Sequence, residues 1–370
     1  MRIAMVTALH PHDDVRIYHK EALTLAHAGH HVEIWNPRYE GVGESGILFC
    51  KLLLPPGRTQ RLWREGNVIM SLLRERSVQV CHLHDPELLT LILRLQRADV
   101  MVVYDAHEDL PRSISTKNWI FTPLRPAASK YACWLLDRKA RMTNGIIAAT
   151  KSIAATLPNS VLVRNRVTGS DCARFWCASQ NESPQPMTVC YAGAITERRG
   201  IFEMTRACAS IGATLLLAGE FESEALYRKL FAMPESDAVC YKGCLNRDKL
   251  ALFYAQSQAG LLLLGDTPSY RSSEPVKLFE YLCAGLPVIA WDYPIWRDLV
   301  GDAAVHFVPP GDVSAASAAI KQILLDPSMW ASAMRQREAC FVRFGFADDA
   351  ERLLTLYNRL EECSHQHHAH

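Results

Sequence analysis

The sequence lacks the features that would mark a membrane-spanning, secreted or nucleic-acid-binding protein. No stretch approaches the roughly 20 apolar residues that a helix needs to cross a bilayer. Residues 1–7 form one short apolar run without the long apolar region and cleavage site of a signal peptide. The 40 basic side chains balance the 39 acidic ones, so no overall charge attracts nucleic acid. We therefore expect a cytoplasmic protein without a nucleic-acid partner.

Cysteine is present but never spaced as a metal-binding pair. The 12 cysteines are scattered along the 370 residues, and no Cys-x-x-Cys occurs. This argues against a zinc site, and we expect reduced, mostly buried thiols. The histidine-rich tail, 365–370, could bind metal adventitiously, but a frayed terminus is the simpler expectation.

Short apolar runs alternate with helical patterns along the whole chain, which is typical of α/β layers with parallel sheets. A polar stretch, 168–186, predicts a linker between two such series. The sequence therefore predicts two doubly wound domains, with ligands at the carboxyl ends of the strands and a cleft between the two domains. The predicted strands are 2–7, 31–35, 78–83, 100–104, 145–149, 161–163, 188–191, 214–218, 239–241, 260–264, 288–290 and 304–307.

The most informative segment is 273–290, SEPVKLFEYLCAGLPVIA. Ser272 or Ser273 is predicted to cap a helix, and Pro275 suits its first turn because a missing N–H costs nothing there. The helix is predicted to end at Gly285, before a buried strand.

The start of this helix combines a cation, a carboxylate and free backbone N–H groups. Lys277 and Glu280 are three residues apart and share one helix face. The amides and Lys277 would bind phosphates, and the carboxylate would bind a ribose diol. This set of groups suits a nucleotide sugar.

The segment resembles the signature of retaining GT-B glycosyltransferases, in particular family four, where Pro-x-Lys-Leu-x-Glu precedes Gly-x-Pro-Val-Ile. The resemblance implies that Glu280 holds the ribose hydroxyls. The family's earlier glutamate corresponds to Ser272 here, while Glu274 is a nearby carboxylate out of register. It also implies two Rossmann-like domains facing a central cleft: 1–168 with a returning helix in 346–370, and 186–345.

A second part of the donor site is predicted after the strand at 188–191, in the segment YAGAITERRG. Gly193 lets the backbone approach a ligand, and Arg198 and Arg199 suit phosphate. The family form has one cation where Ala194 stands here, so that cation is either missing or replaced by Arg198. The predicted donor contacts are Gly193, Arg198, Arg199, Cys244, Leu245, Ser273, Glu274, Pro275, Val276, Lys277 and Glu280.

Polar clusters follow three strands of the first domain, at 10–16, 82–85 and 104–109. Each could be structural, but together at one sheet edge they favour a site. By resemblance His107 approaches the transferred sugar. The predicted acceptor contacts are Asp13, Asp14, Arg16, His84, Asp85, His107 and Glu108. A metal is discounted here, because GT-B enzymes generally place no essential metal on the diphosphate.

Basic residues surround apolar ones in two predicted helices of the first domain, 61–76 and 127–142. Such helices can lie on an anionic membrane, although solvated outer faces of core-packed helices explain them equally well. Lipid-linked acceptors in related enzymes favour the membrane interpretation.

These observations predict a hexosyltransferase that uses a nucleoside diphosphate sugar, with UDP-sugar preferred, and a carbohydrate or lipid-linked hydroxyl acceptor. The resemblance implies retention of the anomeric configuration. Lys277 and Arg199 would stabilise the leaving phosphate, and Asp13 or His107 would act if a base is needed. No cofactor is expected. The alternatives are a sugar-nucleotide epimerase and a degenerate nucleotide-binding partner subunit. A dehydrogenase is disfavoured because Gly-x-Gly-x-x-Gly is absent.

Overall fold

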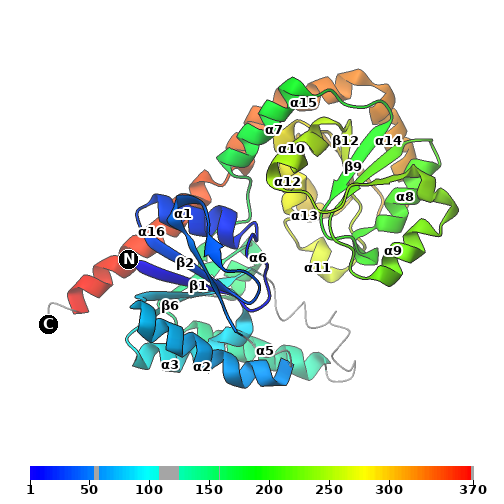
Figure 1. Ribbon diagram of the computed structural model, residues 1–370. Coiled ribbons are helices and arrows are strands. Elements are labelled where there is room, and N and C mark those ends of the chain that lie inside the picture. The colour runs from blue at the N-terminus through cyan, green and yellow to red at the C-terminus, as the bar shows by residue number, and fades with distance from the viewer. Residues whose placement is uncertain (54–57, 108–124, 158, 368–370) are drawn as a thin grey trace. The chain divides into compact units, whose positions relative to one another are not determined.

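The computed structural model describes residues 1–53, 58–107, 125–157 and 159–367 (Figure 1). The chain divides into two compact units, one formed by Met1–Asn165 with Ala347–His370 and the other by Arg166–Phe346. Both are parallel α/β units of the Rossmann type, as the alternation of apolar runs and helical patterns predicted.

The first unit is built on a sheet with the order β3-β4-β2-β1-β5-β6-β7-β8, parallel except for the β3–β4 pair. Its strands are β1 (Arg2–Val6), β2 (His31–Asn36), β3 (Gly41–Val42), β4 (Leu48–Lys51), β5 (Val80–Leu83), β6 (Met101–Ala106), β7 (Gly145–Ala148) and β8 (Val161–Leu162). Its helices are η1 (Ile17–Ala22), α1 (Leu23–His27), η2 (Glu44–Gly46), α2 (Arg58–Arg76), η3 (Pro86–Leu91), α3 (Ile92–Arg97), α5 (Arg125–Ala140), α6 (Lys151–Thr156) and α16 (Ala347–His367).

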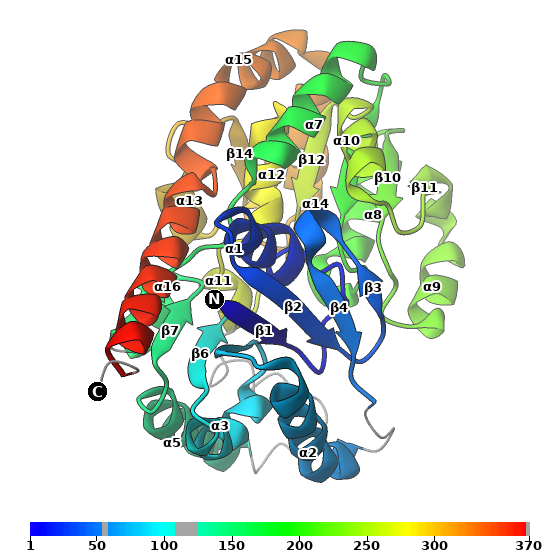
Figure 2. The same ribbon diagram turned by 60° about the vertical axis from the view of Figure 1, so that its left-hand side comes forward.

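Helices cover both faces of this sheet (Figures 1 and 2). Residues of α2, α3 and α5 pack with Val6, Leu83 and Val102 in one buried cluster. The C-terminal helix α16, drawn in red, packs against η1, α1 and β8 on the other side. The C-terminal helix thus returns to the first unit, as predicted.

The second unit has a six-stranded parallel sheet with the order β11-β10-β9-β12-β13-β14. Its strands are β9 (Thr188–Ala192), β10 (Thr214–Ala218), β11 (Val239–Tyr241), β12 (Ala259–Leu262), β13 (Val288–Trp291) and β14 (Val305–Val308). Its helices are α7 (Gly169–Asn181), η5 (Glu197–Arg199), α8 (Ile201–Ala209), α9 (Glu224–Phe231), η6 (Pro234–Ala238), α10 (Arg247–Ala255), α11 (Pro268–Arg271), α12 (Val276–Ala284), α13 (Pro294–Val300), α14 (Val313–Leu325) and α15 (Pro327–Phe344).

The prediction of a linker over 168–186 was wrong for most of its length, because Gly169–Asn181 form helix α7. The Thr168 hydroxyl caps this helix by accepting from the Asp171 N–H. Cys172 and Phe175 are buried against α10 and α12. The polar composition that suggested a linker belongs to the outer face of an amphipathic helix.

Each sheet has a point where the strand order reverses, between β1 and β5 in the first unit and between β9 and β12 in the second. In open α/β sheets ligands bind beside the carboxyl ends of the strands at such a point. The loops after β1, β5, β9 and β12 are therefore the places to look for a site. Among the described residues, no helix combines the length and the apolar character required to cross a membrane.

Candidate functional site

In the second unit, the loops after β9 and β12 are tied together at the switch point. The Gly265 N–H donates to the Arg198 carbonyl at 2.8 Å. Gly200 has a φ of +75°, and a Cβ placed on it would lie 2.0 Å from the Leu263 carbonyl oxygen. Glycine is therefore required at position 200, where the two loops touch.

Arg199 lies where a phosphate-binding cation was predicted. Its guanidinium contacts the hydroxyls of Tyr191 and Tyr270. Its Nη1 atom would lie only 3.3 Å from a Cβ on Gly193, so the cation stands beside the glycine turn. Arg198 and Ala194 are exposed on the same loop.

Helix α12 begins at Val276 with an N-terminus that no side chain caps. The predicted serine caps were wrong: Ser272 and Ser273 donate their hydroxyls to carbonyls of α11 instead, Ser273 to Tyr270 at 3.0 Å. Pro275 is the N-cap residue rather than part of the first turn. The first amides of the helix are left for a ligand, and they carry the positive end of the helix dipole.

Lys277 and Glu280 form the predicted pair, 2.6 Å apart, but Glu280 is buried deeper than a cleft-facing residue would be. Its Oε2 also accepts from the Tyr254 hydroxyl at 2.7 Å, and Arg247 Nη1 lies 3.3 Å from Oε1. Burial raises the pKa of the carboxyl, but the charges of Lys277 and Arg247 outweigh it and lower the pKa to about 2. Glu280 is thus an ionised carboxylate in contact with Lys277, Arg247 and Tyr254. Lys277 is partly exposed and lies in the first turn of the helix.

Two further ion pairs support this region. Arg247 binds the buried Asp171 of α7 through Nε at 2.9 Å. Glu274 was predicted as a donor contact, but its carboxylate forms an ion pair with Arg166 at 3.0 Å. The Arg166 guanidinium also lies 4.0 Å from the centroid of the Phe279 ring. Cys244 is exposed and Leu245 half-buried in the loop after β11. Their predicted contact with the nucleotide base stays a prediction.

The first unit gathers its predicted residues at the carboxyl ends of β1, β5 and β6. A cavity of about 160 Å³ lies there, lined by His10, Asp14, Val15, Arg16, Ile17, His107, Ala149 and Asn165. The rings of His10 and His107 meet edge to face with centroids 4.9 Å apart. Asp14 Oδ1 accepts from the Arg16 and Ile17 amides, and His10 lies 3.4 Å from Oδ2. Asp13 is exposed on the same turn.

Three predicted acceptor residues have other places in the structure. Arg16 is buried and binds both oxygens of Asp105 at 2.6–2.7 Å. His84 is buried with Nδ1 3.3 Å from Asp105. Asp85 is buried and accepts from the Ala8 amide and the Thr7 hydroxyl. Arg16 still lines the cavity, whereas His84 and Asp85 do not, so direct acceptor contact is not supported for His84 and Asp85. Glu108 lies outside the described residues.

Sequence reasoning missed the residues that hold the predicted ones in place. Asp105 lies 3.6 Å from His107 Nδ1. Arg247 and Tyr254 contact Glu280, and Asp171 holds Arg247. Asp105 belongs to the predicted polar cluster at 104–109 but was not predicted as a site residue. Asp171 lies in the stretch that was predicted as a linker, so no structural role was expected for it. The sequence around Arg247 and Tyr254 contains no motif that would indicate a site.

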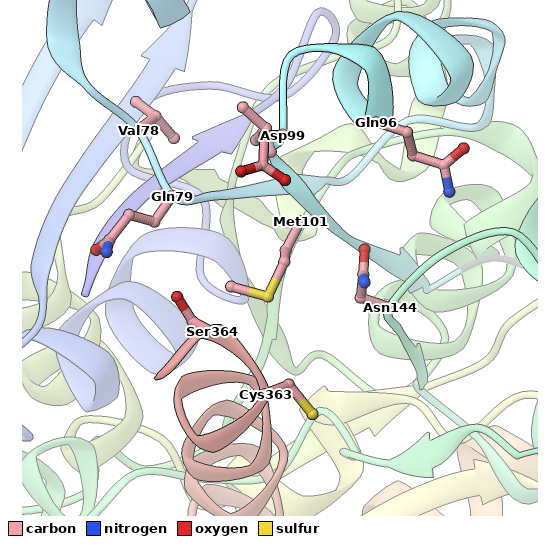
Figure 3. Close-up of a pocket in the computed structure, with 9 residues that line it drawn as sticks. Val78, Gln79, Gln96, Asp99, Met101, Asn144, Cys363 and Ser364 are labelled. Atoms are coloured by element: carbon pink, nitrogen blue, oxygen red, sulfur yellow. The ribbon is translucent and has the colours of Figure 1, made fainter. Parts of the chain in front are cut away.

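The other end of the first sheet has a larger cavity, of about 290 Å³, at the amino ends of β5, β6 and β7 (Figure 3). The side-chain amides that line this cavity already form hydrogen bonds with backbone groups. Gln79 accepts from the Arg2 N–H, Gln96 donates to the Met142 carbonyl, and Asn144 accepts from the Val102 N–H. It offers few free groups to a ligand and lies away from the switch point.

Comparisons with known proteins bear on both units. Residues 174–339 match the family model described as glycosyl transferases group 1, and residues 16–168 match glycosyltransferase family 4. No curated protein matches the chain significantly in sequence.

Several solved structures share the fold over nearly the whole chain. A sucrose-phosphate synthase from Thermosynechococcus elongatus is 18% identical with a TM-score of 0.76, covering 98% of this chain and 99% of that one. HepE from Anabaena, in complex with UDP-glucose, is 13% identical with a TM-score of 0.70, covering 97% and 100%. WaaG, a glycosyltransferase involved in lipopolysaccharide biosynthesis, is 14% identical with a TM-score of 0.64, covering 91% and 95%.

The two family models together span both units, and the free start of α12 carries the Lys277–Glu280 pair that the family signature predicts. The chain therefore belongs to the GT-B glycosyltransferases of the family-four type.

Proposed function

We propose that the protein transfers a hexose-type sugar from a UDP-sugar to a hydroxyl acceptor, with retention of the anomeric configuration. The observation that carries this proposal is the uncapped start of α12 with Lys277 fixed beside the buried carboxylate of Glu280. Anionic phosphates suit the helix start, and ribose hydroxyls suit a carboxylate. The UDP-glucose complex of the structurally similar HepE supports uridine as the base.

The donor diphosphate would bind the amides at Val276 and Lys277, with Lys277 and Arg199 neutralising the charge that grows on the leaving phosphate. Stabilising that charge is the main catalytic demand of the reaction. Of the contacts to Glu280, the one from Arg247 at 3.3 Å is the longest. Oε1 is therefore the oxygen that a ribose hydroxyl would reach most easily.

The departing phosphate oxygen would itself accept the proton of the acceptor hydroxyl, so the transfer needs no dedicated base and no essential metal. Two cations and a helix N-terminus supply the positive charge that a metal would otherwise bring. Asp105 would hold His107 in place to contact the transferred sugar, and Asp13 and Asp14 would bind acceptor hydroxyls at the cavity of the first unit.

We further propose that the acceptor is carbohydrate or lipid-linked and that the enzyme works at the cytoplasmic face of a membrane, in glycan, polysaccharide or glycolipid assembly. On α5, Tyr131 and Trp134 are 62% and 53% exposed and stack at 5.8 Å. The Arg138 guanidinium lies 5.5 Å from the Trp134 ring centroid, and Lys130 is exposed beside it. Exposed aromatic and basic side chains on one helix suit an anionic lipid surface. The other predicted membrane helix is α2, but the side chains of its basic residues at 58–65 lie outside the described residues. The 12 free cysteines suit the reducing environment of the cytoplasm.

Product analysis tests this proposal. The protein is incubated with UDP-sugars labelled in the sugar and with membrane lipid extract, and the products are analysed by NMR. We expect release of UDP and a new glycoside with the donor's anomeric configuration. An isomeric nucleotide sugar would instead identify an epimerase, an inverted linkage would overturn retention, and the absence of any product with every donor would favour a partner subunit.

A further inference from the structure

A buried group of metal-ligating side chains lies in the first unit, beneath the cavity described above. Glu21 comes from η1, His82 from β5, and His84 from the position directly after that strand. All three are fully buried, and one possible ligand atom from each lies within 4.8 Å of the others. The proposed transfer reaction uses none of them.

Several polar atoms of this group have no hydrogen-bond partner. They are Oε2 of Glu21, Nε2 of His82 and Nε2 of His84, whereas Glu21 Oε1 is ion-paired with Arg16 at 3.0 Å. Buried polar atoms are rarely left without a partner, so three together call for an explanation.

The spacing fits a shared metal ion better than direct hydrogen bonds. Glu21 Oε2 lies 3.9 Å from His82 Nε2 and 3.9 Å from His84 Nδ1. This separation is too long for a hydrogen bond. It is within the span of two zinc–ligand bonds, which are about 2.0–2.2 Å each for imidazole nitrogen and carboxylate oxygen.

Other side chains hold these groups in the orientation that a metal site needs. The Tyr357 hydroxyl of α16 lies 3.0 Å from His82 Nδ1, which leaves Nε2 facing Glu21. Arg16 lies 3.0 Å from Glu21 Oε1, which leaves Oε2 facing the histidines. Asp105 Oδ2 lies 3.3 Å from His84 Nδ1 and offers a fourth ligand on that side. Outer contacts of this kind fix ring orientation in metal sites.

The charge of the group also calls for a cation. Arg16 is shared between two carboxylates, those of Glu21 and Asp105. Burying an uncompensated charge is expensive, and neutral histidines do not offset it.

We propose that Glu21, His82 and His84 bind one divalent transition-metal ion, Zn²⁺, as a structural site. Two imidazole nitrogens with carboxylate oxygen form a donor set that suits zinc. The ligands come from η1 and from β5 with the residue after it, and Tyr357 of α16 contacts His82. The ion would therefore link three elements of the first unit. It lies beneath the cavity rather than in it, so the transfer reaction remains independent of it.

The metal content of the full-length chain tests the proposal. The protein is produced without an affinity tag in zinc-supplemented medium, with the tail histidines 365, 367, 368 and 370 replaced by alanine so that adventitious binding is removed. It is dialysed against EDTA, and zinc is measured by mass spectrometry. We expect about one zinc ion per chain to remain, because a buried site exchanges slowly.

Variants and a second metal locate the ion. His82→Ala and Glu21→Gln should lose the zinc, whereas His31→Ala, which removes an exposed histidine of the same unit, should keep it. Chain unfolded in chelator and refolded with CoCl₂ should show the visible absorption of four-coordinate cobalt. If His82→Ala fails to fold, the cobalt spectrum of Glu21→Gln decides. A tail-substituted chain without zinc and without a cobalt band would overturn the proposal and leave a proton on Glu21 as the compensating charge.

Discussion

Replacing Glu280 by alanine separates the two tasks that the structure gives this residue. The carboxylate is buried and held by Lys277, Arg247 and Tyr254, so its loss must affect folding. From the sequence alone, with Glu280 expected to face a cleft, the substitution is predicted to weaken donor binding with little loss of stability. The structure predicts a loss of both.

The size of the stability loss follows from the carboxyl pKa. Its fall from 4.5 to about 2 corresponds to roughly 3 kcal/mol of favourable interaction with the ionised form. Removing one partner of a buried ion pair costs about 3–5 kcal/mol, and Arg247 keeps its pair with Asp171, so the lower end applies. We expect Glu280→Ala to lower the free energy of unfolding by about 3 kcal/mol.

The same shift sets a pH dependence. Because the folded-state pKa lies below the unfolded one, the contribution of Glu280 is complete above about pH 4.5 and is lost as the pH falls towards about 2. Urea unfolding of the wild type at a series of pH values should show this loss. Glu280→Gln, which has no charge to titrate, should lack it.

Donor affinity gives the functional part of the test. Losing a hydrogen bond to a charged group costs about 1.5–3 kcal/mol, so UDP should bind roughly 10- to 100-fold more weakly to Glu280→Ala in calorimetry. Tyr254→Phe is the control, because it removes one hydrogen bond to Glu280 without removing the carboxylate. It should lower stability by about 1 kcal/mol and leave UDP affinity nearly unchanged. A folded Glu280→Ala that binds UDP like the wild type would refute the assignment.

Four further outcomes are expected. Lys277→Ala should lower turnover by about 10²-fold because it removes charge from the leaving phosphate, whereas the exposed Lys249→Ala should not; equal rates would contradict the role of Lys277. Brief exposure to EDTA should leave turnover largely intact, and an absolute requirement for added Mg²⁺ would count against the metal-free transfer. Gly200→Ala should lower the free energy of unfolding by more than about 2 kcal/mol in urea titration, since its Cβ would meet the Leu263 carbonyl; a neutral effect would show that the loops can separate. Trp134→Ser should weaken co-sedimentation with phosphatidylglycerol vesicles and leave UDP binding unchanged, and undiminished co-sedimentation would exclude α5 as the membrane contact.

Much of the fold could be predicted because its signals are local. Each buried parallel strand is a short apolar run, so nearly every strand was found within a few residues. The short strands β3 and β4 were missed. Gly41–Val42 is too short to form a recognisable run, and the apolar run that contains β4, ILFC at 47–50, was not assigned as a strand. Helix α7 was missed because its buried stripe rests on a few residues, Cys172 and Phe175 among them, in a polar setting.

The site was predictable where chemistry and spacing coincide within one helix turn, as for Lys277 and Glu280. It was less predictable where residues distant in sequence meet. Arg247 reaches Glu280 from α10 and is itself paired with Asp171 of α7, and no spacing rule links these three residues. The environment of Asp85 depends on the loop after β1, because Thr7 and Ala8 donate to its carboxylate across 78 and 77 residues of chain, respectively.

The central claim is tested most directly by thermal shift with UDP, GDP, ADP and dTDP, measured without metal on the wild type and on Lys277→Ala. A ligand that binds only the native state stabilises it by about 2.7 kcal/mol at 100 times its Kd. The account predicts a clear rise in the melting temperature of the wild type with UDP, and a much smaller rise for the variant. No shift with any diphosphate, or an equal shift in both proteins, would contradict a donor site at the start of α12.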